Sequence, residues 1–100
     1  MYIFTRTDID KTYQIIQTGH ALFEHALKIK QKPKDISNFC LLQAKDEADL
    51  IKIASKLEIR GIDHTMFHEP DYNTGCTAIA AGPIYGDDRK FFKKFKFYKG

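Results

Sequence analysis

The sequence lacks any apolar run that approaches the roughly 20 residues needed to cross a bilayer. Its beginning, Met1 to Arg6, also lacks the basic-then-apolar pattern of a secretory signal and has the composition of a β-strand. We therefore expect a cytoplasmic protein with no membrane segment.

Cysteine is scarce, which leaves few residues for disulfide bonds or for cysteine-bound metal sites. The chain has two cysteines, Cys40 and Cys76, and both stand in strand-like runs that suit buried free thiols. The sequence shows neither a paired-cysteine zinc pattern nor a glycine-rich phosphate loop. In an extended strand, His64 and His68 would lie roughly 13 Å apart, too far to chelate one ion. We expect neither a metal site nor a cofactor.

What the sequence does contain is typical of a single globular domain, residues 1–100. Hydrophobic residues make up 43% of it and charged residues 29%, which suits a modest core with a solvated surface. The net charge is only +3, but much of the positive charge lies near the C-terminus. This clustering favours a polyanionic partner at that part of the chain.

A long amphipathic helix is expected between Lys11 and Ile29. On a helical wheel at about 100° per residue, we expect one broad apolar arc to face the core: Ile15, Gly19, Leu22, Phe23, Ala26 and Leu27. Four polar residues follow the edge of this arc, and we interpret them as a candidate site: Tyr13, Gln17, His20 and Glu24. The alternative is that they are ordinary boundary residues with satisfied hydrogen bonds.

The remaining elements alternate in a way that predicts an α/β fold. We expect strands at 2–6, 39–44, 62–68 and 76–83. A second helix should begin after Asp46 as N-cap and stop at Gly61. Because 39–44 is almost continuously apolar, we place it at the centre of the sheet.

Loop 69–75 is rich in Pro, Asp, Asn and Gly, and should join the last two strands as an antiparallel hairpin. The prediction is a three-layer single domain with a mixed, mostly parallel four-stranded sheet.

The C-terminal tail alternates basic and aromatic residues. Residues 91–95 have helical spacing of phenylalanines, and 94–99 has the pattern of an edge strand. The rings can simply cap the core, but lysines interleaved with aromatics also suit nucleic acid. We expect tRNA or another RNA as a partner, contacted through Arg89, Lys90, Lys93, Lys94 and Lys96. The basic segment 28–34 is interpreted as a complement to the helix dipole, with polyanion contact as the alternative.

The order of these elements resembles the type II peptidyl-tRNA hydrolases. The motif Gln17-Thr18-Gly19-His20-Ala21 is similar to the Gln-x-x-His-Ala motif in that family's first helix. The run Thr77-Ala78-Ile79-Ala80-Ala81-Gly82-Pro83 is similar to its late strand, which ends in Gly-Pro before a terminal helix. The helix from Asp46 to Gly61 and the ending Phe97-Tyr98 also have counterparts there. The resemblance covers nearly the whole chain and implies a peptidyl-tRNA hydrolase II-like fold.

The positions that would carry the family's chemistry are partly changed. Tyr13 stands four residues before Gln17, where the family has a lysine, while Lys11 matches an earlier lysine. The family's Asp-Ala-Gly-Arg-Thr-Gln loop is replaced by a shorter one. In this loop Glu69 falls nearest the acidic position, and Asp71 is a second candidate.

The first function that this implies is a hydrolase that cleaves the ester of peptidyl- or aminoacyl-tRNA. Such a reaction needs a base to activate water and donors for the developing oxyanion. Glu69 or Asp71 is the candidate base. The candidate donors and water-orienting groups are Gln17, His20, Lys11 and Tyr13.

The alternative is a non-catalytic module that keeps the fold and binds RNA or a protein partner. A metal-dependent hydrolase using His20, Glu24 and a loop carboxylate is a third and weaker hypothesis, because a clear third ligand is missing. The sequence leaves a homodimer open.

Overall fold

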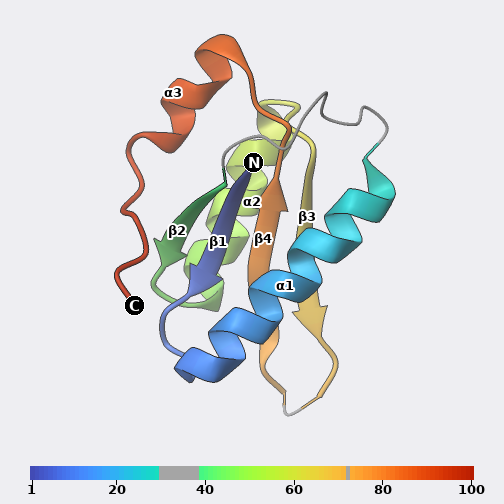
Figure 1. Ribbon diagram of the computed structural model, residues 1–100, viewed down its shortest axis with the longest axis vertical. Helices are drawn as coiled ribbons and strands as arrows, with labels where there is room; N and C mark the ends of the chain where they lie inside the picture. The colour runs from blue at the N-terminus through green and yellow to red at the C-terminus, as the bar shows by residue number, and fades with distance from the viewer. Residues whose placement is uncertain (30–38, 72) are drawn as a thin grey trace.

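Four strands form one mixed sheet in the computed structural model, which describes residues 1–29, 39–71 and 73–100. The strands are β1 (Tyr2–Arg6), β2 (Cys40–Ala44), β3 (His64–Glu69) and β4 (Gly75–Ala81), in the spatial order β2-β1-β4-β3. β1 pairs parallel with β2, whereas β4 runs antiparallel to both β1 and β3. Three strands therefore point the same way (Figure 1). The sheet is mixed, as expected. The expectation that it is mostly parallel is wrong, because β4 lies among the three, so that only the β1–β2 pairing is parallel.

The expected central position of 39–44 is wrong, because β2 lies at an edge and β1 and β4 occupy the centre. The free edge of β2 is covered by the C-terminal tail. The Gln43 N–H donates to the Lys96 carbonyl at 3.0 Å, and the Tyr98 N–H donates to the Leu41 carbonyl at 2.9 Å. Leu42 and Phe97 form the antiparallel bridge between them. The tail thus behaves as the expected edge segment and shields a strand that would otherwise be exposed.

The two long helices, α1 (Lys11–Lys28) and α2 (Glu47–Ile59), lie on opposite faces of the sheet (Figure 1). On the α2 side, the core is built around Phe4, Leu42 and Ile79 and closed by Phe91 and Phe92. The last two residues belong to the short helix α3 (Arg89–Phe92), which follows the 3-10 turn η1 (Gly86–Asp88). The alternative in which the tail rings cap the core is therefore confirmed for these two phenylalanines.

The predicted ends of α2 are confirmed by their hydrogen bonds. The Asp46 carboxylate accepts from the Asp49 N–H at 2.9 Å, as an N-cap does. At the other end Gly61 has φ +68°, and the Ile62 N–H reaches the Leu57 carbonyl at 3.0 Å. This is the Schellman arrangement, in which a left-handed glycine stops the helix and satisfies its last carbonyls.

The expected orientation of α1 is wrong, because its polar side faces the sheet. The buried residues are Gln14, Gln17, Ala21 and His25. By contrast, Ile15 is 71% exposed, Phe23 69% and Leu27 70%. The physical reason lies in β4, where small side chains such as Ala78 and Ala80 allow α1 to approach closely through Ala21.

The buried glutamines and histidine on this face of α1 also find partners. His25 Nε2 donates to the Gly82 carbonyl at 2.7 Å, and His25 Nδ1 accepts from the Thr65 hydroxyl at 2.9 Å. Gln14 Nε2 donates to the Ile9 carbonyl at 2.7 Å. Satisfied polar groups can be buried at little cost, so the wheel pattern alone did not decide which face turned inward.

Two further expectations concern cysteines and membranes. Cys40 and Cys76 are free thiols, each half-buried rather than fully buried. Within residues 1–29, 39–71 and 73–100, no helix is both long and apolar enough to cross a membrane. Residues 30–34, most of the basic segment discussed above, lie outside the described part of the chain.

Candidate functional site

A chain of three side chains joins α1, β3 and β4 at one end of the sheet. Gln17 Nε2 donates to Glu69 Oε2 at 2.8 Å, and the Thr77 hydroxyl donates to Gln17 Oε1 at 2.8 Å. Gln17 and Thr77 are 1% and 0% exposed, so the amide is held from both sides within the core. Glu69 can therefore be reached from α1, as the order of motifs predicted, while Gln17 lies on the inner face of α1 rather than at its border.

Glu69 is the last residue of β3 and the outermost member of this hydrogen-bonded group. Its surroundings favour the ionised carboxylate. Its Oε1 also accepts from the Asp71 backbone N–H at 3.2 Å. The hydrogen bond from Gln17 and then that from Asp71 hold the pKa of Glu69 below its ordinary value, and the nearby His20 acts in the same direction. A carboxylate with a lowered pKa remains charged at neutral pH but is a weaker base than an unperturbed one.

Tyr13 contributes a buried hydroxyl beside this carboxylate. Among the described residues, its oxygen is the buried side-chain polar atom left without a hydrogen bond of good geometry. Burial raises the pKa of Tyr13, and the negative charges of Glu69 and Asp71 raise it further. The hydroxyl is therefore protonated at neutral pH, and it lies close enough to Glu69 to help lower the pKa of that carboxyl.

His20 and Glu24 lie outside the hydrogen-bonded chain. The exposed His20 ring stacks on Phe67 of β3, with ring centroids 4.8 Å apart and planes 7° from parallel. Glu24 forms an ion pair with Lys28 at 2.9 Å, one helical turn along α1. The His20 ring thus packs against β3, the strand that carries Glu69, whereas the Glu24 carboxylate pairs with Lys28.

The two remaining predicted residues hold different positions. Asp71 is exposed and is tied to Glu69 through its backbone N–H rather than its carboxylate. Lys11 is exposed at the start of α1 and lines a separate cavity of about 460 Å³ with Gln14, Tyr98 and Lys99. The structure therefore gathers Tyr13, Gln17 and Glu69, and places Lys11 outside that group.

Sequence reasoning missed two residues that hold the site in place. Thr77 fixes the Gln17 amide, and its only signal was a hydroxyl within a run of small strand residues. Arg6, at the end of β1, donates to the Thr74 carbonyl at 2.7 Å and the Cys76 carbonyl at 3.0 Å. Arg6 also pairs with Asp8 at 2.8 Å, and so fixes the start of β4 against β1.

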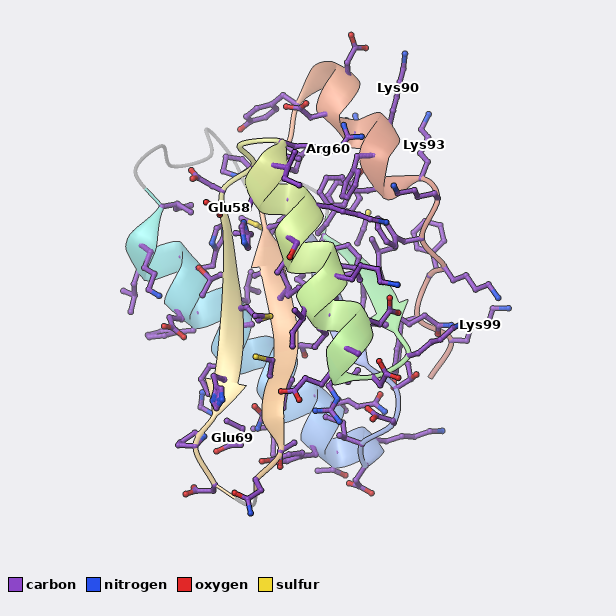
Figure 2. All side chains as sticks on the ribbon, turned by 180° about the vertical axis from the view of Figure 1, so that it is seen from behind. Glu58, Arg60, Glu69, Lys90, Lys93 and Lys99 are labelled. Atoms are coloured by element: carbon purple, nitrogen blue, oxygen red, sulfur yellow. The ribbon has the colours of Figure 1, made fainter. Side chains whose placement is uncertain are left out.

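Two of the predicted RNA-binding cations, Lys90 and Lys93, lie far from this site. Figure 2 shows Lys90 and Lys93 near one end of the molecule, beside Arg60 of α2, and Glu69 at the opposite end. Lys94 Nζ lies 4.5 Å from the centroid of the Phe91 ring, and the Arg60 guanidinium carbon lies 4.6 Å from the same centroid. Arg89 and Lys96 are also exposed, so all five predicted cations reach solvent.

This basic cluster includes residues of α2 that the sequence did not point to. Burial lowers the pKa of Lys94, and the positive charges of Lys56 and Arg60 lower it further. Like charges that lie close enough to affect one another favour an anion between them. The tail and α2 therefore share one positive surface.

The metal-dependent hypothesis finds no ligand set in the part of the chain that the structure describes. No three side chains of the His, Cys, Asp or Glu type gather closely enough there to hold a metal ion. In particular, the Glu24 carboxylate forms an ion pair with Lys28 and is not part of a ligand set with a loop carboxylate.

No protein-family model matches the sequence, and no curated protein matches it. What the geometry provides is an ionised carboxylate, a fixed amide and a buried phenol that meet where β3 ends.

Proposed function

We propose that the chain is a hydrolase of the type II peptidyl-tRNA hydrolase kind, with that family's three-layer fold, which cleaves the ester of peptidyl- or aminoacyl-tRNA. The observation that carries the proposal is the meeting of ionised Glu69 with the fixed Gln17 amide and the buried Tyr13 hydroxyl, which has no hydrogen bond of good geometry among the described residues.

The chemistry assigned to these groups is a water attack on the ester carbonyl. A carboxylate has about four lone-pair sites, so Glu69 can accept from water in addition to Gln17 and the Asp71 N–H. Glu69 orients the water and takes its proton as the new carbon–oxygen bond forms. Tyr13, protonated because its pKa is raised, donates to the developing oxyanion. The ester bond then breaks, and the proton passes from Glu69 to the departing sugar oxygen.

The RNA would be held by the basic residues of the tail. They run from Lys90 and Lys93, at the end of the molecule opposite Glu69 (Figure 2), to Lys94 and Lys96, which line a cavity with Ala44 at the end of β2. The cations Arg89, Lys90, Lys93, Lys94 and Lys96 neutralise backbone phosphates, while the ester-bearing end reaches Glu69. This requires an extended substrate, because the longest dimension of the protein is 36 Å. A cytoplasmic location belongs to the same proposal and is supported by the two free thiols.

Ester cleavage by two conservative variants tests the proposal. Purified protein is incubated with peptidyl-tRNA and with several aminoacyl-tRNAs, and the released acyl group is measured. Glu69→Gln preserves the shape and should lower turnover by about 10²–10⁴-fold at saturating substrate, because it removes the proton acceptor. Tyr13→Phe should also lower turnover, because it removes the hydroxyl that donates to the oxyanion and leaves the ring in place.

Glu58→Gln is the matched control, because Glu58 is exposed on α2 and lies away from Glu69 (Figure 2). It makes the same chemical change and should leave turnover intact. If the folded wild type cleaves none of these esters, the hydrolase proposal fails.

A non-catalytic RNA-binding module is the second candidate, and one observation favours it. Glu69 already accepts two hydrogen bonds that lower its pKa, which weakens it as a base. This candidate predicts that tRNA binds to the wild type with no turnover, and that Glu69→Gln leaves the affinity unchanged. Measuring affinity and cleavage in the same samples separates the two functions.

A further inference from the structure

Helix α1 turns its apolar side to solvent and away from the sheet. The outward residues are spaced three and four apart and form a stripe along the helix, which lies across the front of the sheet in Figure 1. Phe39, just before β2, continues the stripe. We call this surface the outer α1 face and define it as Ile15, Ile16, Gly19, Leu22, Phe23, Leu27 and Phe39.

The outer α1 face is large enough to serve as an interface. Five of its six big apolar side chains are between 49% and 71% exposed, and the sixth, Leu22, is half-buried. At about 200 Å² for each whole side chain, the five present roughly 600 Å², the upper end of what a monomer usually leaves open. Two such faces brought together bury roughly 1,200 Å², which reaches the range of specific protein interfaces.

The face carries no charge that would select a charged partner or repel a second copy. None of its residues is ionisable, and the nearby Glu24 and Lys28 neutralise each other at 2.9 Å. An uncharged apolar surface gains from being covered by another apolar surface, and the identical face of a second chain meets that requirement.

The shape of the face is also complementary to itself. A cavity of about 460 Å³ is lined by Gly19, Leu22, Phe23 and Phe39, among others. A Cβ built on Gly19 would meet no atom within 4 Å, so the helix surface is hollow at this point. One turn further along, Phe23 projects with 69% of its surface exposed. A two-fold symmetric contact requires one patch to offer both the hollow and the group that fills it.

We propose that the outer α1 face is the interface of a symmetric homodimer. In this dimer the two α1 helices pack antiparallel, and Phe23 of each copy fits against Gly19 of the other. The same register brings Ile15 of one copy opposite Leu27 of the other. This proposal does not depend on the hydrolase assignment, because the Gln17–Glu69 site lies on the inner face of α1.

The test is the molar mass of the full chain in sedimentation experiments at concentrations up to about 1 mM, where even a weak dimer is populated. The wild type should show a concentration-dependent dimer. Phe23→Glu should weaken its association at least tenfold, because it places a charge in an apolar contact. Gly19→Leu should do the same by filling the hollow. Its unfolding temperature should not fall, because nothing in the monomer lies in the way.

Ile59→Glu is the matched control, because Ile59 is 85% exposed on α2 and lies outside the proposed interface. It should leave the wild-type association constant unchanged. A wild type that stays monomeric over the whole range overturns the proposal. So does a dimer that persists in Phe23→Glu or in Gly19→Leu, since either result places the contact elsewhere.

Discussion

Three buried polar residues decide how α1 lies on the sheet. Gln17 and His25 hydrogen-bond to Glu69 and Gly82, which are distant in sequence. Gln14 hydrogen-bonds to the Ile9 carbonyl, just before the helix. A typical hydrogen bond contributes about 1 kcal/mol net, but a buried group left without a partner costs about 1–3 kcal/mol. Turning the helix over would lose these bonds and would also set large side chains in place of Ala21 against the small residues Ala78 and Ala80 of β4.

The pH dependence of stability should report the burial of His25. Burial lowers the pKa of His25 below its ordinary 6.5. Just below pH 6.5 the imidazole is therefore protonated in the unfolded chain and neutral in the folded chain. The contribution is fully present above pH 6.5 and is lost as the pH falls below it. We expect the free energy of unfolding in urea to decline below pH 6.5 by up to about 1.4 kcal/mol per pH unit from this group.

His25→Gln should flatten this decline, since an amide can still donate to the Gly82 carbonyl but does not titrate. His68→Gln provides the comparison, because His68 is exposed on β3. If the His25→Gln protein keeps the wild-type slope, His25 is not the titrating group.

At the scale of the element, α2 depends on its N-cap. Asp46 accepts from the Asp49 N–H, and the Asp49 carboxylate in turn accepts from the Lys45 N–H at 2.9 Å. This pair satisfies two backbone donors, close to the arrangement of a capping box. We expect Asp46→Ala to lower the free energy of unfolding by about 1 kcal/mol, measured by urea denaturation.

Asp88→Ala serves as the control for the cap, because Asp88 occupies the same position before α3 but its side chain makes no capping hydrogen bond. It should change the free energy of unfolding far less than Asp46→Ala does. Equal losses in the two variants would show that the Asp46 side chain does not act as a cap.

At the scale of the whole molecule, the basic surface near α3 and the candidate site at Glu69 lie at opposite ends. The basic surface at Arg60, Lys90, Lys93 and Lys94 adjoins α3, whereas Glu69 ends β3 (Figure 2). Binding and chemistry should therefore respond to different substitutions, because the groups do not touch.

RNA affinity should fall when two cations of this surface are removed. In Lys93→Gln/Lys94→Gln, each lost phosphate contact should lower the slope of log affinity against log salt by about 0.7–0.9. Turnover at saturating RNA should be unaffected, if the protein is a hydrolase. Fluorescence anisotropy over a salt series measures both affinity and slope.

Lys28→Gln/Lys99→Gln removes the same charge from positions away from α3 and should leave the slope nearly unchanged. If the two double variants weaken binding equally, net charge alone drives the association and the positive surface has no special role.

The sequence alone predicted the elements and, within a residue or two, the ends of the two long helices. The first helix was expected at 11–29 and spans Lys11–Lys28, and the second was expected between Asp46 and Gly61 and spans Glu47–Ile59. These features depend on residues a few positions apart, such as Asp46 with Asp49 and Gly61 with Leu57 and Ile62. The hairpin of β3 and β4 is equally local. The resemblance to a hydrolase family, and with it the catalytic roles, stays a prediction.

Only the tertiary structure decided which face of α1 is buried and where β2 lies in the sheet. Gln17 meets Glu69 across 52 positions of sequence and Thr77 across 60, and neither contact has a periodicity that a helical wheel could show. The apolar run of β2 was equally ambiguous, because a tail that covers an edge strand buries it as neighbouring strands would. Local hydrogen bonds are set by adjacent residues, whereas the choice among competing faces depends on partners that only the folded chain brings together.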